Sequence, residues 1–128
     1  PGRGGLRGLF TDLEAVVIAT LESYGVTGER EPGRPGVFVA GRKIASIGLA
    51  VKRSVTSHGL ALNVGRDLGV FSLITPCGLQ GVAPTSLALE MPADRAANFS
   101  SEDALFHDVK RTLVAAFESV FGQKAVLA

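Results

Sequence analysis

Residue types that bind metals, close disulfides or cross membranes are scarce in this chain of 128 residues. It holds one cysteine, two histidines and no tryptophan. This set cannot form an internal disulfide and lacks the ligand spacing of a zinc site. No apolar run approaches the roughly 18 to 20 residues of a membrane span, and PGRGGLRGLF at the start lacks the apolar segment of a secretory signal. We expect one soluble domain over 1–128, most simply cytoplasmic, with no metal and no membrane partner.

Acidic residues are absent between positions 32 and 66. One interpretation of this basic segment is an acidic protein partner, and the other is ordinary solvated loop charge. Nucleic acid is disfavoured because the basic residues are not interleaved with aromatic ones. There is also no GxxxxGK[ST] phosphate loop and no GxSxG nucleophile elbow. The basic residues of the segment are Arg34, Arg42, Lys43, Lys52, Arg53 and Arg66.

Two stretches have the apolar spacing of amphipathic helices. The first, LFTDLEAVVIATLESYG, ends at Gly25, and the second opens with Ser100 and Asp103 at the spacing of a capping box. The two apolar stripes are Leu9, Phe10, Leu13, Val16, Val17, Leu21 and Tyr24, and Leu105, Phe106, Val109, Leu113, Phe117, Val120 and Phe121.

Strands are predicted between these helices. After a surface loop, VTGEREPGRPG, the runs VFVA and KIASIGLAV are separated by Gly41 and Arg42, which predicts a type II′ hairpin turn. Residues 54–64, SVTSHGLALNV, alternate like a third strand, and TSLALE indicates a further one. The pattern predicts an α+β domain, a mainly antiparallel sheet flanked by helices.

Small side chains are concentrated on these strands. Strict alternation puts Lys43, Ala45 and Ile47 on one face of their strand and Ser46, Gly48 and Ala50 on the other. With Gly59 and Ala61 on the next strand, a flat ligand or an acyl chain could lie against the sheet. Close packing of a helix on these residues is the ordinary alternative.

Each of the notable titratable residues has an ordinary explanation. Lys43 at a strand end could simply reach water, His58 could be a hydrogen-bonded core or rim histidine, and His107 falls on the polar part of the last helix. Cys77, between Pro76 and Gly78, is either an apolar filler or a nucleophile displayed on a turn.

Four motifs in order carry a family resemblance. They are KIASIG at 43–48, HGLALN at 58–63, PCG at 76–78 and TSL at 85–87. The region containing them resembles the lipoyl(octanoyl) transferases, which move an octanoyl group from acyl carrier protein to a lysine of a lipoyl domain. The resemblance implies the biotin and lipoate ligase-like fold and no cofactor. The implied acceptors are lipoyl domains of 2-oxoacid dehydrogenase complexes or the glycine cleavage H protein.

Residue roles follow from the resemblance alone. It implies that Cys77 forms an acyl thioester, that Lys43 lowers the pKa of this thiol and transfers protons, and that His58 is a possible neighbour of the site. Related ligases that work through an adenylate have no cysteine nucleophile at the position of Cys77. The implied substrate-binding residues are Ser46, Ile47, Gly48, Gly59, Leu60 and Ala61.

One family motif is not found in this sequence. Transferases of this type carry RGGxxTxHxPGQ in an N-terminal portion that forms part of the acyl pocket, and PGRGG shares letters with it but not its order. We therefore expect a partial catalytic domain, truncated at its N-terminus. The alternative is a module that binds carrier or lipoyl domains without catalysis, or an inactive fragment.

Overall fold

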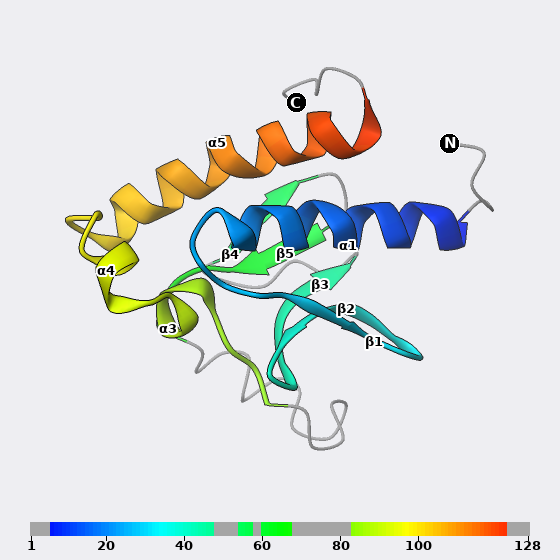
Figure 1. Ribbon diagram of the computed structural model, residues 1–128, viewed down its shortest axis with the longest axis horizontal. Helices are drawn as coiled ribbons and strands as arrows, with labels where there is room; N and C mark the ends of the chain where they lie inside the picture. The colour runs from blue at the N-terminus through cyan, green and yellow to red at the C-terminus, as the bar shows by residue number, and fades with distance from the viewer. Residues whose placement is uncertain (1–5, 48–53, 58–59, 68–82, 123–128) are drawn as a thin grey trace.

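A five-stranded sheet with helices is the architecture of the computed structural model, which describes residues 6–47, 54–57, 60–67 and 83–122 (Figure 1). The strands stand in the order β1-β2-β3-β5-β4, and each neighbouring pair is antiparallel. The expected α+β fold is thereby confirmed. The elements are α1 (Leu6–Glu22), β1 (Glu29–Glu31), β2 (Arg34–Val39), β3 (Arg42–Ile47), β4 (Ser54–Ser57), β5 (Leu60–Asn63), α3 (Leu87–Glu90), α4 (Ala93–Ala96) and α5 (Glu102–Phe121).

The two long helices lie side by side and cover one face of the sheet (Figure 1). Helix α1 contacts α5, β2 and β3, and α5 also contacts β4. Apolar residues three and four positions apart form one stripe on each helix, and the two stripes bury each other and the sheet. Both predicted stripes are confirmed at their centres, since the fully or almost fully buried residues include Leu13, Val16, Val17, Leu21, Val109 and Leu113.

The helix ends differ from the predicted ones by a few residues. Helix α1 ends at Glu22, and Gly25 follows in a turn with φ of 77°. Helix α5 is capped by Ser101, whose side chain accepts a hydrogen bond from the amide of Ala104, so the predicted capping box of Ser100 and Asp103 is wrong by one residue. At its other end, Gly122 takes the left-handed conformation that closes a helix.

The predicted loop over residues 26–36 is wrong, because it contains β1 and the start of β2. These strands pair as a hairpin around Pro32 and Gly33, where Gly33 supplies a φ of 77°. The next hairpin turns at Ala40 and Gly41, with φ of 50° and 83°, and Val39 pairs with Arg42. Positive φ at both central residues defines a type I′ turn, so the predicted type II′ turn at Gly41 and Arg42 is also wrong.

Two further strand predictions are wrong. Residues 54–64 form two strands, β4 and β5, that pair with each other, with residues 58 and 59 outside the described part of the chain. TSLALE contains helix α3, because the Ser86 side chain accepts a hydrogen bond from the amide of Leu89 and so caps a helical turn. The amide of Ala88 donates to the carbonyl of Val64 and fixes this turn to the end of β5.

Candidate functional site

An irregular pairing between β2 and β3 decides which way Lys43 points. Val37 pairs with Ala45, but its neighbour Phe38 pairs with Lys43, so the register shifts between the two pairs. Adjacent residues of a strand point to opposite faces, and directly paired residues share a face. Lys43 and Ala45 therefore lie on opposite faces although they are two residues apart. The predicted grouping of Lys43 with Ala45 is wrong, and its physical cause is a β-bulge.

The bulge brings Lys43 onto the same face as the small residues of β3 and β5. Ser46 pairs with Ala61, and both are buried on the face opposite α1 and α5. Ala45 belongs to the other face, where it packs in the helix-covered core with Val37 and Leu62. The sheet therefore has a Lys43 face, which contains Lys43, Phe38, Ser46 and Ala61, and a helix face.

The Lys43 side chain extends along β2 across Gly36. A Cβ atom added to Gly36 would lie 2.9 Å from Cε of Lys43 and 2.6 Å from the carbonyl oxygen of Ala45, so only glycine leaves room there. Gly36 also has φ of 125°, a conformation that side chains rarely adopt. The Lys43 amine lies 6.0 Å from the centre of the Phe38 ring. Position 36 thus shapes the path of the lysine.

The Lys43 amine is half-buried and electrostatically perturbed. Its burial lowers its pKa below the ordinary lysine value, because the charged form is desolvated, and the nearby positive charge of Arg34 lowers it further. An amine that loses its proton more readily is better suited to donating and accepting protons near neutral pH. Lys43 can therefore serve as a proton-transfer group.

The backbone of Lys43 is held by the segment before α3. Its amide donates to the carbonyl of Ala83 at 2.8 Å, and its carbonyl accepts from the amide of Thr85 at 2.8 Å. The side-chain amide of Asn63 donates to the Thr85 carbonyl at 3.1 Å. Hydrogen bonds thus join the first residue of KIASIG and the last residue of HGLALN to the first residue of TSL. These three motifs are separate in the sequence.

The predicted substrate-binding residues divide between the two faces. The side chains of Ser46 and Ala61 belong to the Lys43 face, whereas Ile47 pairs with Leu60 on the helix face, where Leu60 is fully buried in the core. Gly48, His58, Gly59 and Cys77 lie outside the described residues, so these positions stay predictions. His107 is exposed on α5, as expected.

Residues around Gly36 and Lys43 that sequence analysis missed belong to two ion-pair clusters. In the first, a buried Glu14 carboxylate on α1 accepts from the Gly36 amide at 2.9 Å and from Arg30 at 3.1 Å. In the second, Arg42 makes two 2.9 Å hydrogen bonds to Glu90. No local sequence pattern marks Glu14 or Glu90, because each acts through residues distant in the chain.

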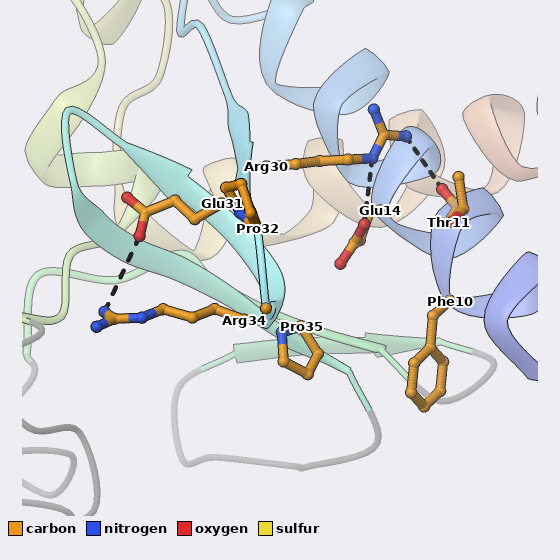
Figure 2. Close-up of a pocket in the computed structure, with 9 residues that line it drawn as sticks. Phe10, Thr11, Glu14, Arg30, Glu31, Pro32, Arg34 and Pro35 are labelled. Carbon is orange, nitrogen blue, oxygen red and sulfur yellow. Dashed lines mark hydrogen bonds and ion pairs between the residues drawn. The ribbon is translucent and has the colours of Figure 1, made fainter.

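A surface pocket of about 720 Å³ lies between α1 and the β1–β2 hairpin (Figure 2). Figure 2 shows Arg30 reaching to Glu14 and Thr11 on α1, while Glu31 and Arg34 face each other on the hairpin at 3.9 Å. The pocket shares Arg34 with the electrostatic surroundings of Lys43 and Glu14 with the contacts of Gly36. Its lining residues are Phe10, Thr11, Glu14, Arg30, Glu31, Pro32, Gly33, Arg34 and Pro35.

Neither a metal-binding cluster nor a membrane-spanning helix is found in the described ranges. They contain no group of three histidine, cysteine or acidic residues arranged to hold a metal ion. None of the helices in those ranges combines the length and apolarity needed to span a bilayer.

Comparison with known protein families gives a match over most of the chain. The family model of the lipoyl protein ligase A/B catalytic domain matches residues 2–118. The chain belongs to this family. The match spans all four motifs and confirms the resemblance and the ligase-like fold expected from the sequence.

Curated relatives of this family member are octanoyltransferases. The chain is 48% identical over 125 residues to that of Nitratidesulfovibrio vulgaris strain DP4, a match covering 98% of this chain and 54% of the relative. The octanoyltransferase of Desulfovibrio desulfuricans is 55% identical over 87 residues, covering 68% and 37%. That of Cellvibrio japonicus is 49% identical over 88 residues, covering 69% and 41%. The chain thus spans about half the length, or less, of these relatives.

Proposed function

We propose that this chain is part of an octanoyltransferase that moves an octanoyl group from acyl carrier protein to a lysine of a lipoyl domain. The observation that carries this proposal is the orientation of Lys43 and the lowered pKa of its amine. The bulge turns Lys43 onto the face of Ser46 and Ala61, and burial lowers the pKa of its amine. Membership of the ligase A/B family and similarity to octanoyltransferases support the same reaction.

The first step forms an acyl-enzyme on Cys77. The Cys77 thiolate attacks the carbonyl carbon of the octanoyl thioester, a new carbon–sulfur bond forms, and the carrier leaves as a thiol after taking a proton from the Lys43 ammonium. The thiolate is the nucleophile, and an ordinary thiol with pKa of about 8.5 is mostly protonated at neutral pH. An ammonium about 4 Å away contributes on the order of 4 kcal/mol at an effective dielectric of about 20. Half of that would lower the thiol pKa by about 1.5 units.

The second step transfers the acyl group to nitrogen. The amine of the target lysine attacks the Cys77 thioester, an amide bond forms, and the carbon–sulfur bond to Cys77 breaks. Lys43, neutral after the first step, accepts the proton that the attacking amine loses. A lysine with a lowered pKa suits both roles, because it must release a proton in one step and regain it in the other. No cofactor is required by this chemistry.

The acyl chain would lie along the Lys43 face. Ser46 and Ala61 present small side chains there, and Gly48 and Gly59 extend the same pattern. Ile47 and Leu60 direct their side chains to the helix face, so they would contact the substrate through their backbone. We place His58 beside this surface as a neighbour without a chemical role.

Basic residues near Lys43 would attract both protein partners. Arg34 and Arg42 flank the Lys43 region on β2 and β3, and acyl carrier proteins and lipoyl domains are generally acidic. Positive charge at the site would raise the rate of encounter with both partners and make it salt-dependent. We also propose that the protein is cytoplasmic, as expected from its sequence.

The test is the intact mass of the natural protein after incubation with octanoyl-acyl carrier protein. We expect a gain of one octanoyl group that is lost in Cys77→Ser and greatly slowed in Lys43→Ala. ATP with free octanoate should give no adduct, which separates this reaction from that of adenylate-forming ligases. If the folded protein binds octanoyl-acyl carrier protein but gains no mass, it is a binding module and the proposed transfer is wrong.

A further inference from the structure

Glu90 at the end of α3 is the centre of a polar cluster beside Lys43. Its carboxylate accepts two hydrogen bonds of 2.9 Å from Nε and Nη2 of Arg42 and one of 2.6 Å from Oγ1 of Thr85. The Glu90 side chain is 14% exposed. The hydrogen bonds from Arg42 lower the pKa of its carboxyl more than burial raises it. Glu90 is thus ionised at neutral pH and joined to both partners by charge-assisted bonds.

Both partners of Glu90 are attached to the backbone of Lys43. Arg42 immediately precedes Lys43, and the Thr85 amide donates to the Lys43 carbonyl at 2.8 Å. Asn63 binds the Thr85 carbonyl from β5. The Arg42–Glu90–Thr85 cluster therefore forms a closed connection around the peptide units on either side of Lys43.

The sheet itself supports this part of β3 weakly. β5 pairs with β3 only at Ala45, Ser46 and Ile47, and on that side Lys43 is paired with the 83–85 segment through a single isolated bridge to Pro84. On its other side Lys43 pairs with Phe38 of β2, directly beside the bulge at Ile44, where the register shifts. The position of Lys43 thus depends on how firmly residues 83–85 are held, and the cluster holds them.

We propose that Glu90 is a positioning residue for Lys43, acting through Arg42 and Thr85. The inference rests on the proposed function, since it assigns Lys43 the proton transfers described above. A catalytic group displaced by about 1 Å can lose on the order of 100-fold in rate. A carboxylate that fixes the lysine backbone therefore affects the reaction without touching the substrate.

The first test compares Glu90→Gln and Arg42→Gln with Arg111→Gln in the natural protein. Arg111→Gln removes a matched ion pair of 2.8 Å, to Asp108 on α5. We expect Glu90→Gln to lower kcat for transfer by about tenfold or more with little change in KM. Arg42→Gln should lower kcat in the same way and also raise KM, because it removes a positive charge that attracts both partners. The Arg111 variant should transfer at the natural rate. In a Lys43→Ala background, Glu90→Gln should cause no further loss, because both changes act on the same group.

A second readout does not require activity. The fraction of Lys43 labelled by an amine-modifying reagent is measured against pH by mass spectrometry. Release of the cluster should let the amine reach water, so its pKa should rise toward the ordinary value in Glu90→Gln and not in Arg111→Gln. If Glu90→Gln does not fold, Arg42→Gln, which alters a more exposed side chain, decides the question.

The outcomes separate the inference from the proposed function. If the natural protein transfers nothing but Lys43 labelling shifts as expected, the proposed reaction fails and the positioning role stands. If the natural protein transfers octanoyl and the Glu90 variant matches it in rate and labelling, the inference is overturned. A loss of rate with unchanged Lys43 labelling, or one that persists in the Lys43→Ala background, would also overturn it, because it would indicate a general structural role.

Discussion

The two faces of the sheet are built in different ways. On the helix face, Val37, Ala45 and Leu62 form a row across β2, β3 and β5 and bury themselves under α1 and α5. On the Lys43 face, the neighbouring pairs are Phe38 with Lys43 and Ser46 with Ala61. The helix face thus consists of apolar side chains only in this row, whereas the Lys43 face combines an amine, an aromatic ring and small side chains.

This difference shows how a bulge can turn one side chain to the other face without weakening the core. Ile44, the residue between the two shifted pairs, is itself fully buried in the core cluster. The shift therefore costs little apolar burial while it moves Lys43 to the other face. Substitutions on the helix face should change the free energy of unfolding, and substitutions on the Lys43 face should change the rate of octanoyl transfer.

The largest stability effect is expected on the helix face. Leu113→Ala removes a side chain of α5 that is 1% exposed within the core. Such substitutions cost about 2 to 5 kcal/mol, because transfer free energy is lost and a cavity remains. Transfer by the fraction that stays folded should be unchanged. Leu89→Ala is the control, since Leu89 is 45% exposed and its loss should change stability by about 0.5 kcal/mol or less.

Urea unfolding followed by circular dichroism measures both variants. The comparison between faces would break down if Leu113→Ala left stability unchanged, or if it reduced transfer at temperatures where the variant is fully folded.

Gly36→Ala should affect both properties, because Gly36 borders the Lys43 side chain. An added Cβ would meet the Ala45 carbonyl at 2.6 Å and Lys43 Cε at 2.9 Å, and φ of 125° is unfavourable for alanine. A residue forced into such a conformation costs about 1 to 3 kcal/mol. We expect a loss of that size together with a clear fall in transfer rate, because the lysine must take another path.

Gly33→Ala is the matched control. Gly33 also has positive φ, of 77°, but its Cβ would meet nothing within 4 Å. It should therefore lose stability through backbone strain alone and transfer at the natural rate. If both glycine variants transferred equally well, Gly36 would have no part in directing Lys43.

Sequence periodicity predicted the helix face well and the Lys43 face poorly. The stripes of α1 and α5 are continuous over several turns, so their burial followed from spacing alone. The bulge depends on pairing between strands, which alternation within β3 cannot reveal, and it reversed the expected orientation of Lys43. The short segment TSLALE was also predicted poorly. Its composition favours a strand, but the Ser86 side chain caps a helical turn there.

The candidate site was predicted from motifs rather than from periodicity. The motifs singled out Lys43, Ser46 and Ala61, but alternation along the strand put Lys43 on the face opposite Ser46. The bulge, which brings all three onto one surface, could not be predicted from the motifs. Glu90 and Gly36 went unnoticed, because each acts through a tertiary contact: one with Arg42 and Thr85, the other with the lysine side chain. Residues that support a site through distant partners leave no local pattern.

The smallest effect concerns the stability cost of the lysine itself. Because burial lowers the pKa of Lys43 in the folded protein, the folded state binds fewer protons than the unfolded state between that lowered pKa and the ordinary value of about 10.4. Stability from this group is complete above the ordinary value and is lost as pH falls through the lowered pKa. At neutral pH the folded protein therefore holds a partly desolvated charge at a cost.

Lys43→Met removes that charge and keeps the apolar stem over Gly36. We expect the free energy of unfolding at pH 7 to rise slightly, and the gain to vanish above pH 10.5, while transfer is abolished. Thermal unfolding at a series of pH values measures this, with Lys110→Met on the exposed side of α5 as the control for loss of a lysine charge at the surface. A stable but inactive variant would show that the Lys43 face retains its amine for chemistry at the expense of stability. A less stable variant would show instead that the ammonium contributes to the fold, and the contrast between the two faces would then lose its basis.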